Sequence, residues 1–296
     1  MSTSTGREDI GLIGIGLVGS AIAEHLLARG YGVVGYDIDP ACCDVLSKLG
    51  GEPVSAVSQV AKRADRVFLS LLTTETVREV VEGDAGLLDT PDPPRHIIDT
   101  TTGTPDETIA LAERLAGRGV GFLDATISGS SQQIRDREAL FMVGGRDEPV
   151  AACRDLLDAV SEKVIHVGPP GSGSKAKLAS NLILGLNRLV LAEGLVFAEK
   201  LGLDLPSFLS LLKQSPAYSV AMDVKGEKML NSDFTAQARV SQHNKDLRII
   251  LDCADEVLQE LPLAQIHHQI LEQLISDGDG DLDCSAVIKA IRDRKK

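Results

Sequence analysis

The chain has 296 residues, of which 43% are hydrophobic and 25% charged, proportions typical of a globular protein with one large or two ordinary domains. Its formal net charge of −13, together with the lack of an apolar run of about 18 residues, argues against nucleic acid and membrane partners. Five cysteines without a CxxC pair and an N-terminal MSTSTGRED too polar for a signal peptide predict a cytoplasmic protein.

Residues 10 to 165 alternate short apolar segments with stretches of helical periodicity. Apolar segments that predict β-strands lie at 10–13, 32–36, 66–71, 96–99, 121–124, 140–143 and 163–166. Between most of them, apolar residues recur three and four apart, as at 21–27 and 77–81. This alternation predicts an α/β domain with a mostly parallel sheet and helices on both faces.

After residue 167 the strand pattern stops. A loop, GPPGSGS at 168–174, precedes a long helical pattern at 175–202, and the remainder stays helical. We therefore predict an α/β domain at 1–167 and an all-helical domain at 168–296, joined by a long helix. The apolar run 182–197 is hydrophobic on nearly all sides of that helix, which suits burial between subunits of a homodimer or homotetramer.

Three glycines stand between the first predicted strand and the first predicted helix, in the pattern GxGxxG. Gly14 would make the tight turn, Gly16 would let a pyrophosphate approach the backbone, and Gly19 would let helix and strand pack closely. The N–H groups of the helix N-terminus would hold the phosphates, as in a Rossmann domain. The residues predicted to contact a dinucleotide here are Gly14, Ile15, Gly16, Leu17, Val18 and Gly19.

Asp37 ends the second predicted strand, at roughly the distance where an acidic residue meets the adenosine ribose. A carboxylate there would repel a 2′-phosphate, and Ile38 follows where an NADP site usually has arginine. The sequence therefore favours NAD over NADP. The alternative is that Asp37 is only a solvated strand end.

Three further stretches follow in order: IIDTTTGTP at 97–105, LDATISGSS at 123–131 and GSGSKAKLASN at 171–181. Each is unremarkable alone. Together, after a dinucleotide motif, they resemble the β-hydroxyacid dehydrogenase family, which includes 3-hydroxyisobutyrate dehydrogenase and tartronate semialdehyde reductase. The resemblance runs from about residue 10 to residue 290.

The resemblance implies roles for several residues outside the glycine turn. It places Thr102, from the DxSTxxP turn, at the cofactor, together with Leu71 and Leu72, which stand where the family has Leu-Pro. It makes Ser128 and Gly129 holders of the substrate carboxylate. The match also departs from the family in this loop, because Ser130 and Gln133 replace glycines, and Arg137-Glu-Ala139 replaces Gly-Thr-Leu. Ser130 and Gln133 are accordingly expected to shape the substrate pocket.

The pattern GxGxxxKxxxN implies that Lys177 is the catalytic lysine and that Asn181 orients the substrate. The two residues are four apart, so they lie on one face of a helix. A lysine amine can exchange a proton with the reacting oxygen, whereas an amide does not titrate. Lys175 is the local alternative but points elsewhere. In the family's KDL motif, Lys245 would approach the cofactor and the active site.

These observations predict an NAD-dependent oxidoreductase that interconverts a small anionic β-hydroxy acid, or a related short hydroxy acid, with its aldehyde or keto acid. A cofactor-binding scaffold without catalysis, or an imine or semialdehyde reductase, remains the alternative. No metal site is expected: SDGDGDLD at 276–283 has Leu282 where a calcium loop needs glycine.

Overall fold

The computed structural model describes residues 7–294 and divides into two compact units, Met1–Lys177 and Leu178–Lys296. Residues 1–6, the start of the polar stretch that argues against a signal peptide, lie outside the described residues, as do 295–296. The division falls inside a long helix rather than in the loop after residue 167, because the first turns of that helix pack on the sheet of the first unit.

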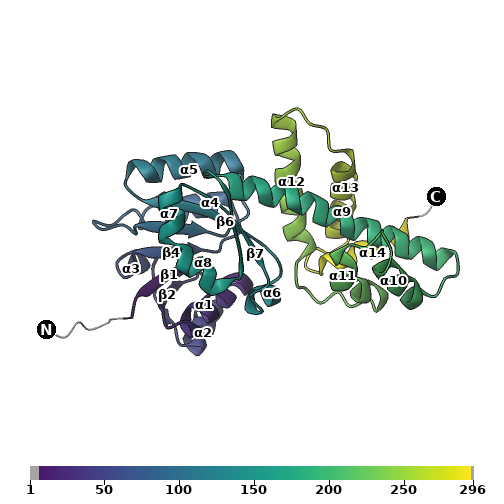
Figure 1. Ribbon diagram of the computed structural model, residues 1–296, viewed down its shortest axis with the longest axis horizontal. Coiled ribbons are helices and arrows are strands. Elements are labelled where there is room, and N and C mark those ends of the chain that lie inside the picture. Colours follow the sequence, from purple (N-terminus) through teal and green to yellow (C-terminus); the bar gives the residue numbers. More distant parts are fainter. Residues whose placement is uncertain (1–6, 295–296) are drawn as a thin grey trace. The chain divides into compact units, whose positions relative to one another are not determined.

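The first unit contains one eight-stranded sheet in the order β3-β2-β1-β4-β5-β6-β7-β8 (Figure 1). Its strands are β1 (Asp9–Ile13), β2 (Gly32–Tyr36), β3 (Glu52–Pro53), β4 (Arg66–Leu69), β5 (His96–Asp99), β6 (Gly121–Ser128), β7 (Leu140–Gly145) and β8 (Lys163–Gly168). All neighbouring strands are parallel except β6 and β7. The mostly parallel sheet expected from the sequence is therefore confirmed.

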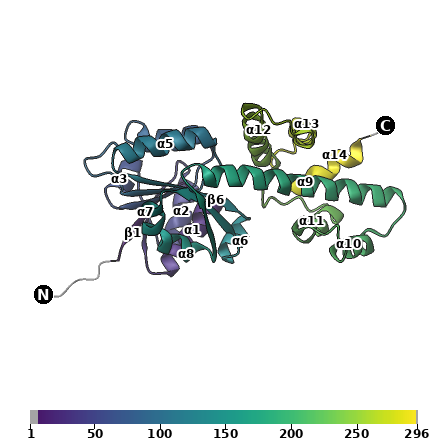
Figure 2. The same ribbon diagram turned by 45° about the horizontal axis from the view of Figure 1, so that its top comes forward.

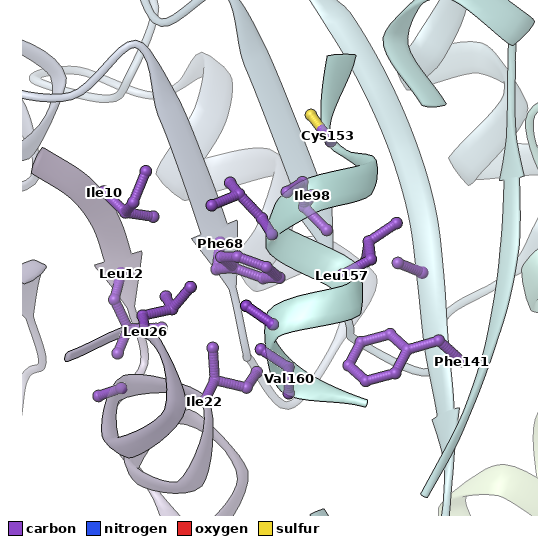
Figure 3. Packing of buried hydrophobic residues seen from close by; sticks show 14 of the residues in the cluster. Ile10, Leu12, Ile22, Leu26, Phe68, Ile98, Phe141, Cys153, Leu157 and Val160 are labelled. Atoms are coloured by element: carbon purple, nitrogen blue, oxygen red, sulfur yellow. The ribbon is translucent and has the colours of Figure 1, made fainter. Parts of the chain in front are cut away.

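Helices cover both faces of this sheet. They are α1 (Leu17–Ala28), α2 (Pro40–Leu49), α3 (Val57–Ala61), α4 (Thr74–Glu82), α5 (Pro105–Gly117), α6 (Ser131–Arg135), α7 (Asp147–Ala152) and α8 (Arg154–Val160). On one face, Ile22 of α1 and Leu157 of α8 pack with Phe68 of β4 in a core without exposed surface (Figure 3). On the other, Val77 of α4 and Leu111 of α5 belong to a separate buried cluster.

Strand β6 is longer than its apolar segment predicts. It extends to Ser128 because β7 pairs with it antiparallel, with Ser128 opposite Leu140. Residues 125–128, ATIS, contain a single large apolar side chain, Ile127, so no apolar run extends the predicted strand beyond residue 124. The extension carries the chain past the end of β5, whose last residue, Asp99, pairs with Asp124.

The second unit is helical, as expected, and its helices are shown in Figure 2. They are the main part of α9 (Ser172–Lys200), then α10 (Leu205–Lys213), α11 (Val220–Leu230), α12 (Val240–Glu256), α13 (Pro262–Ser276), the short 3-10 helix η1 (Cys284–Ala286) and α14 (Val287–Asp293). Leu191 and Leu195 of α9 pack with Leu247 of α12 and Leu271 of α13 in one buried cluster.

Helix α9 is long and apolar enough to cross a membrane by length and composition alone, and 44% of its most apolar stretch is buried within the protein. Its buried side chains also include Lys177, Asn181 and Arg188. The apolar residues of α9 supply much of the core of the second unit, which gives its hydrophobicity a structural explanation.

The acidic side chains around the rejected calcium loop have lysine partners. Asp283 is fully buried and its carboxylate lies 2.8 Å from the ammonium of Lys225. Although burial alone would raise it, the pKa of Asp283 is lowered to about 2 by Lys225 and backbone N–H groups. Asp279 lies 2.6 Å from Lys289. Within residues 7–294, no cluster of three metal-ligating side chains occurs.

A pair of histidines is buried in the second unit. His267 of α13 packs against His243 of α12, with ring centroids 5.2 Å apart, and the Cβ of an alanine at Gly185 would stand only 2.4 Å from His243. Arg188 of α9 lies against the same imidazole. Burial, followed by the charges of Arg188 and His268, lowers the pKa of His267 to about 4. The second unit therefore folds around a neutral His267.

We expect the second unit to lose stability as pH falls from about 6.5 to about 4. In this pH window His267 is protonated in the unfolded state but stays neutral in the folded state, so lowering the pH favours unfolding. The loss is on the order of 3 kcal/mol when complete, at about 1.4 kcal/mol per pKa unit. Hydrogen exchange of α12 and α13 measures it. His267→Leu should flatten the pH dependence in this window, and an unchanged slope would contradict the assignment. Asp283, with its pKa near 2, contributes only at lower pH.

Candidate active site

The predicted cofactor and substrate residues of the first unit meet at one edge of the sheet. Gly14 follows β1, Leu71 follows β4, Thr102 follows β5, and Ser128 ends β6. These four strands are parallel neighbours, so their carboxyl ends share this edge. The chain also reverses its winding direction between β1 and β4, the position where open α/β sheets bind ligands.

The three glycines of the turn have three different reasons to be glycine. Gly14 has a φ of +88°, and a Cβ on it would stand 2.2 Å from the carbonyl oxygen of Ser70. A Cβ on Gly19 would stand 2.0 Å from the carbonyl oxygen of Gly14. Gly16 has a φ of −67°, which any residue adopts, and a Cβ there would meet nothing within 4 Å. Neither backbone conformation nor packing within the protein requires a glycine at position 16. A ligand that approaches the backbone here would explain why this residue has no side chain.

Helix α1 begins directly after this turn, so the backbone N–H groups of its first turn lie beside the glycines. Its N-cap, Gly16, supplies no side-chain hydrogen bond, and the first turn contains no acidic residue. Backbone N–H groups at such a helix end, aided by the helix dipole, bind phosphates. Leu17 is exposed and Val18 half-buried, so the first turn is accessible from outside the core.

Asp37 lies beside the glycine turn and bonds to it. Its carboxylate accepts hydrogen bonds from the backbone N–H groups of Ile15, at 2.6 Å, and Asp39, at 2.9 Å. It is therefore more than a solvated strand end. The bond to Ile15 ties the end of β2 to the turn after β1, and the role of Asp37 at an adenosine ribose stays a prediction.

The threonine-rich turn after β5 is bonded to the segment after β4. The Thr101 hydroxyl accepts a hydrogen bond from the Leu71 N–H at 3.1 Å, and Thr101 N–H donates to the buried carboxylate of Asp99. Thr102 is half-buried beside them, and Leu72 is 69% exposed. The structure thus places Leu71, Leu72 and Thr102 in two loops, after β4 and after β5, that are bonded to each other.

The loop after β6 shows what the residues that depart from the family do. Gly129 has a φ of +150°, which favours glycine. The Ser130 hydroxyl accepts a hydrogen bond from the Gln133 N–H at 3.2 Å, while the Gln133 side chain accepts one from the Ser130 N–H at 2.9 Å. This capping box begins α6. Their polar groups thus serve the local backbone, and a part in the substrate pocket remains a prediction.

Lys177 and Lys175 differ in burial on the same helix. Lys177 is 8% exposed, whereas Lys175 is exposed to solvent. A buried lysine is uncommon unless the protein makes contacts for it. This difference favours Lys177 over its neighbour as the functional lysine.

Asn181 and Lys245 of the second unit share one buried carboxylate. The Asn181 amide donates a hydrogen bond to Asp246 at 2.9 Å, and the Lys245 ammonium lies 3.4 Å from the other oxygen of the same carboxylate. Asp246 is 6% exposed. It fixes which end of the Asn181 amide faces it and holds a cation next to that amide.

Two buried acidic residues, one in each unit, were assigned no role from the sequence. Asp124 and Asp246 each stand inside a motif that drew attention for another residue, DATISG for Ser128 and KDL for Lys245. Each carboxylate is more than nine-tenths buried. For Asp124 the available signal was an aspartate among apolar and small residues, LDATISG, which needs hydrogen-bonding partners when buried. Asp246 stands among polar residues, HNKDLR, and gives no such signal.

Residues 9–168 match the sequence family described as the NAD binding domain of 6-phosphogluconate dehydrogenase. Residues 171–291 match the family described as the NAD-binding domain of NADP-dependent 3-hydroxyisobutyrate dehydrogenase. A 2-(hydroxymethyl)glutarate dehydrogenase of Eubacterium barkeri is 31% identical over 95% of this chain and 93% of its own length. The chain belongs to the β-hydroxyacid dehydrogenase family.

Human mitochondrial 3-hydroxyisobutyrate dehydrogenase is 28% identical, covering 98% of this chain and 88% of its own length. A solved structure of Mycobacterium tuberculosis 3-hydroxyisobutyrate dehydrogenase with L-serine superposes with a TM-score of 0.87, at 27% identity, over 97% of this chain and 99% of that one. An imine reductase from Pseudomonas sp. has a TM-score of 0.64 at 20% identity over 97% and 100%, which shows the shared fold alone.

Proposed function

We propose that this member of the β-hydroxyacid dehydrogenase family uses NAD to interconvert a small hydroxy acid and its aldehyde or keto acid. The observation that carries the proposal is the buried Lys177, one helical turn before the buried Asn181 on α9. The glycine turn at the edge of the sheet supplies the cofactor site. The named relatives act on 2-(hydroxymethyl)glutarate, 3-hydroxyisobutyrate and L-threonate, all short hydroxy acids.

The residues at the sheet edge fit a dinucleotide. The open space at Gly16 and the uncapped N-terminus of α1 would receive the pyrophosphate, and Asp37 would accept hydrogen bonds from the adenosine ribose. Thr102, Leu71 and Leu72 would lie toward the nicotinamide. When bound, NAD would supply the hydride acceptor for the carbinol carbon, and NADH would supply the hydride for the reverse reaction.

The protein's own residues then manage the proton and the substrate. The amine of Lys177 accepts the hydroxyl proton during oxidation, and its ammonium returns the proton during reduction. Asn181 hydrogen-bonds the reacting substrate without competing for the proton, because an amide does not titrate. Ser128 and the backbone of Gly129 would hold the substrate carboxylate, and Lys245 adds positive charge in a chain of net negative charge.

The retained lysine favours this function over a scaffold and over an imine reductase. A screen of 3-hydroxyisobutyrate, L-threonate and 2-(hydroxymethyl)glutarate with NAD, and of glyoxylate and succinic semialdehyde with NADH, tests it by the absorbance of NADH. We expect turnover of at least one compound. Tight NAD binding with no turnover of any of them would support the scaffold instead.

We expect the double variant Asp37→Ala, Ile38→Arg to shift the preference from NAD toward NADP by on the order of 10- to 100-fold. The change removes a carboxylate that would repel the 2′-phosphate and adds a charged partner, an effect of about 1–3 kcal/mol. Because Asp37 also supports Ile15, NAD affinity should fall as well. Kinetics with both cofactors measure the ratio.

The single variants separate the two contributions. Ile38 is 88% exposed, so Ile38→Arg alone should leave stability and NAD affinity nearly unchanged while improving NADP affinity modestly. Asp37→Ala alone should weaken NAD more than NADP. A wild-type enzyme that already prefers NADP would show that Asp37 does not serve the ribose.

We also propose that the protein is a cytoplasmic homodimer or homotetramer. Ile183, Val190 and Phe197 of α9 are each more than 60% exposed and stand seven residues apart, so they form one apolar stripe. A continuous exposed stripe of this kind suits packing against a second copy of the chain. Sedimentation equilibrium of the purified protein decides between monomer and oligomer.

A further inference from the structure

A buried carboxylate holds the start of the helix that carries Lys177. Asp124 of β6 is 1% exposed, and its two oxygens accept hydrogen bonds from the backbone N–H groups of Gly171, at 2.9 Å, and Ser174, at 2.8 Å. Two residues farther along β6, the Thr126 hydroxyl donates to the carbonyl of Gly173 at 2.9 Å.

These bonds act on the groups that a helix leaves without partners. The first N–H groups of α9 have no carbonyl within the helix, and burying them without an acceptor would cost free energy. In the bonds described above, the acceptor for these N–H groups is the Asp124 carboxylate, which comes from the sheet and not from α9. Burial raises the pKa of Asp124, while the bonds from Ser174 and Gly171 oppose that rise.

The backbone of this turn has little room to move. A Cβ on Gly173 would stand 2.2 Å from the carbonyl oxygen of Asp124, and one on Gly144 of β7 would stand 2.7 Å from the Gly173 nitrogen. Gly171 has a φ of +87°, and a Cβ on it would stand 2.5 Å from Ile109 of α5. The first turn of α9 therefore packs closely on the backbone of β6 and β7, and Gly171, just before it, packs on the Ile109 side chain of α5.

Lys177 follows Ser174 by three residues, so it stands on the next turn of a continuous helix. A helix is rigid over one turn, and a shift at Ser174 displaces the lysine with it. Misplacing a catalytic group by about 1 Å costs on the order of 100-fold in rate. We propose that Asp124 and Thr126 are positioning residues that set the place of the Lys177 amine by fixing the first turn of α9. This inference rests on the proposed role of Lys177.

Asp124→Asn tests the proposal most directly. Asparagine offers one acceptor oxygen and turns an N–H₂ group toward one of the two N–H donors. We expect turnover to fall about 10- to 100-fold, with NAD affinity changed less than about threefold, because the glycine turn and Asp37 are untouched. A variant with wild-type turnover would overturn the proposal. The substrate is whichever of 3-hydroxyisobutyrate, L-threonate and 2-(hydroxymethyl)glutarate is turned over fastest.

The double variant Asp124→Asn, Lys177→Ala distinguishes positioning from a general structural defect. If Asp124 acts through Lys177, the double variant should have the turnover of Lys177→Ala alone. Multiplication of the two losses would overturn the proposal. A Lys177→Ala variant that keeps its turnover would instead defeat the proposed function, so the two failures can be told apart.

Thr126 supplies a milder test should Asp124→Asn fail to fold. Thr126→Val keeps the shape of the side chain and removes the donor to Gly173, whereas Thr126→Ser keeps the donor. We expect Thr126→Val to lower turnover about 3- to 10-fold at nearly constant NAD affinity and Thr126→Ser to restore most of it. Equal turnover in valine and serine variants would overturn the role of this hydroxyl.

Discussion

Replacement of Lys177 with alanine is expected to lower turnover of the hydroxy acid by roughly 100-fold or more, the scale for losing a general acid–base. The fold should survive, because alanine is the best helix former and the Asp124 carboxylate, which accepts hydrogen bonds from the N–H groups of Gly171 and Ser174, still holds the start of α9. NAD affinity should stay nearly constant, since the lysine serves the reacting oxygen. Steady-state oxidation and separate NAD titrations measure the two effects.

Two further variants show whether the lost group is the amine itself. Lys177→Arg should not restore turnover, because guanidinium stays protonated near neutral pH and cannot accept the proton during oxidation. Lys175→Ala is the matched control, since this lysine lies on the same helix and is exposed. Most of the turnover remaining in Lys177→Ala, or an equal loss in Lys175→Ala, would contradict proton transfer by Lys177.

The sequence was sufficient to predict the alternating strands and the glycine turn because their signals are local. An apolar segment, a glycine with positive φ and an amphipathic helix each occupy a few neighbouring residues. β3 was missed because its two residues, Glu52 and Pro53, contain no apolar run, and it forms only by pairing with β2. The extension of β6 was missed for the same reason, since β7 imposes it from elsewhere in the chain.

The site shows the same division between local and distant information. The resemblance to the family pattern GxGxxxKxxxN implied roles for Lys177 and Asn181, and their four-residue spacing agrees with one face of a helix. The buried carboxylates nearby come from distant parts of the sequence: Asp124 accepts a bond from Ser174 in the first turn of α9 across 50 residues, and Asp246 accepts one from Asn181 across 65 residues. Ser130 and Gln133 illustrate the opposite case, because a serine with glutamine three residues later is a local capping signal.

Gly16→Ala and Gly19→Ala are expected to separate cofactor binding from folding. At Gly16 the added methyl meets no protein atom, so the free energy of unfolding should change by no more than about 1 kcal/mol, chiefly because alanine is a poorer N-cap. The methyl would nevertheless occupy the space proposed for the pyrophosphate, and NAD affinity should fall on the order of 100-fold. Thermal unfolding with and without NAD measures both quantities.

At Gly19 the added methyl would lie 2.0 Å from the carbonyl oxygen of Gly14, so α1 must move away from the turn. Overpacking of this kind typically costs about 1–3 kcal/mol, and it displaces the N–H groups that would hold the phosphates. Gly19→Ala should therefore lose both stability and NAD binding. Gly117→Ala, where a methyl also meets no atom, is the control and should change neither by much. If Gly16→Ala binds NAD normally, the open space beside Gly16 is not the pyrophosphate site.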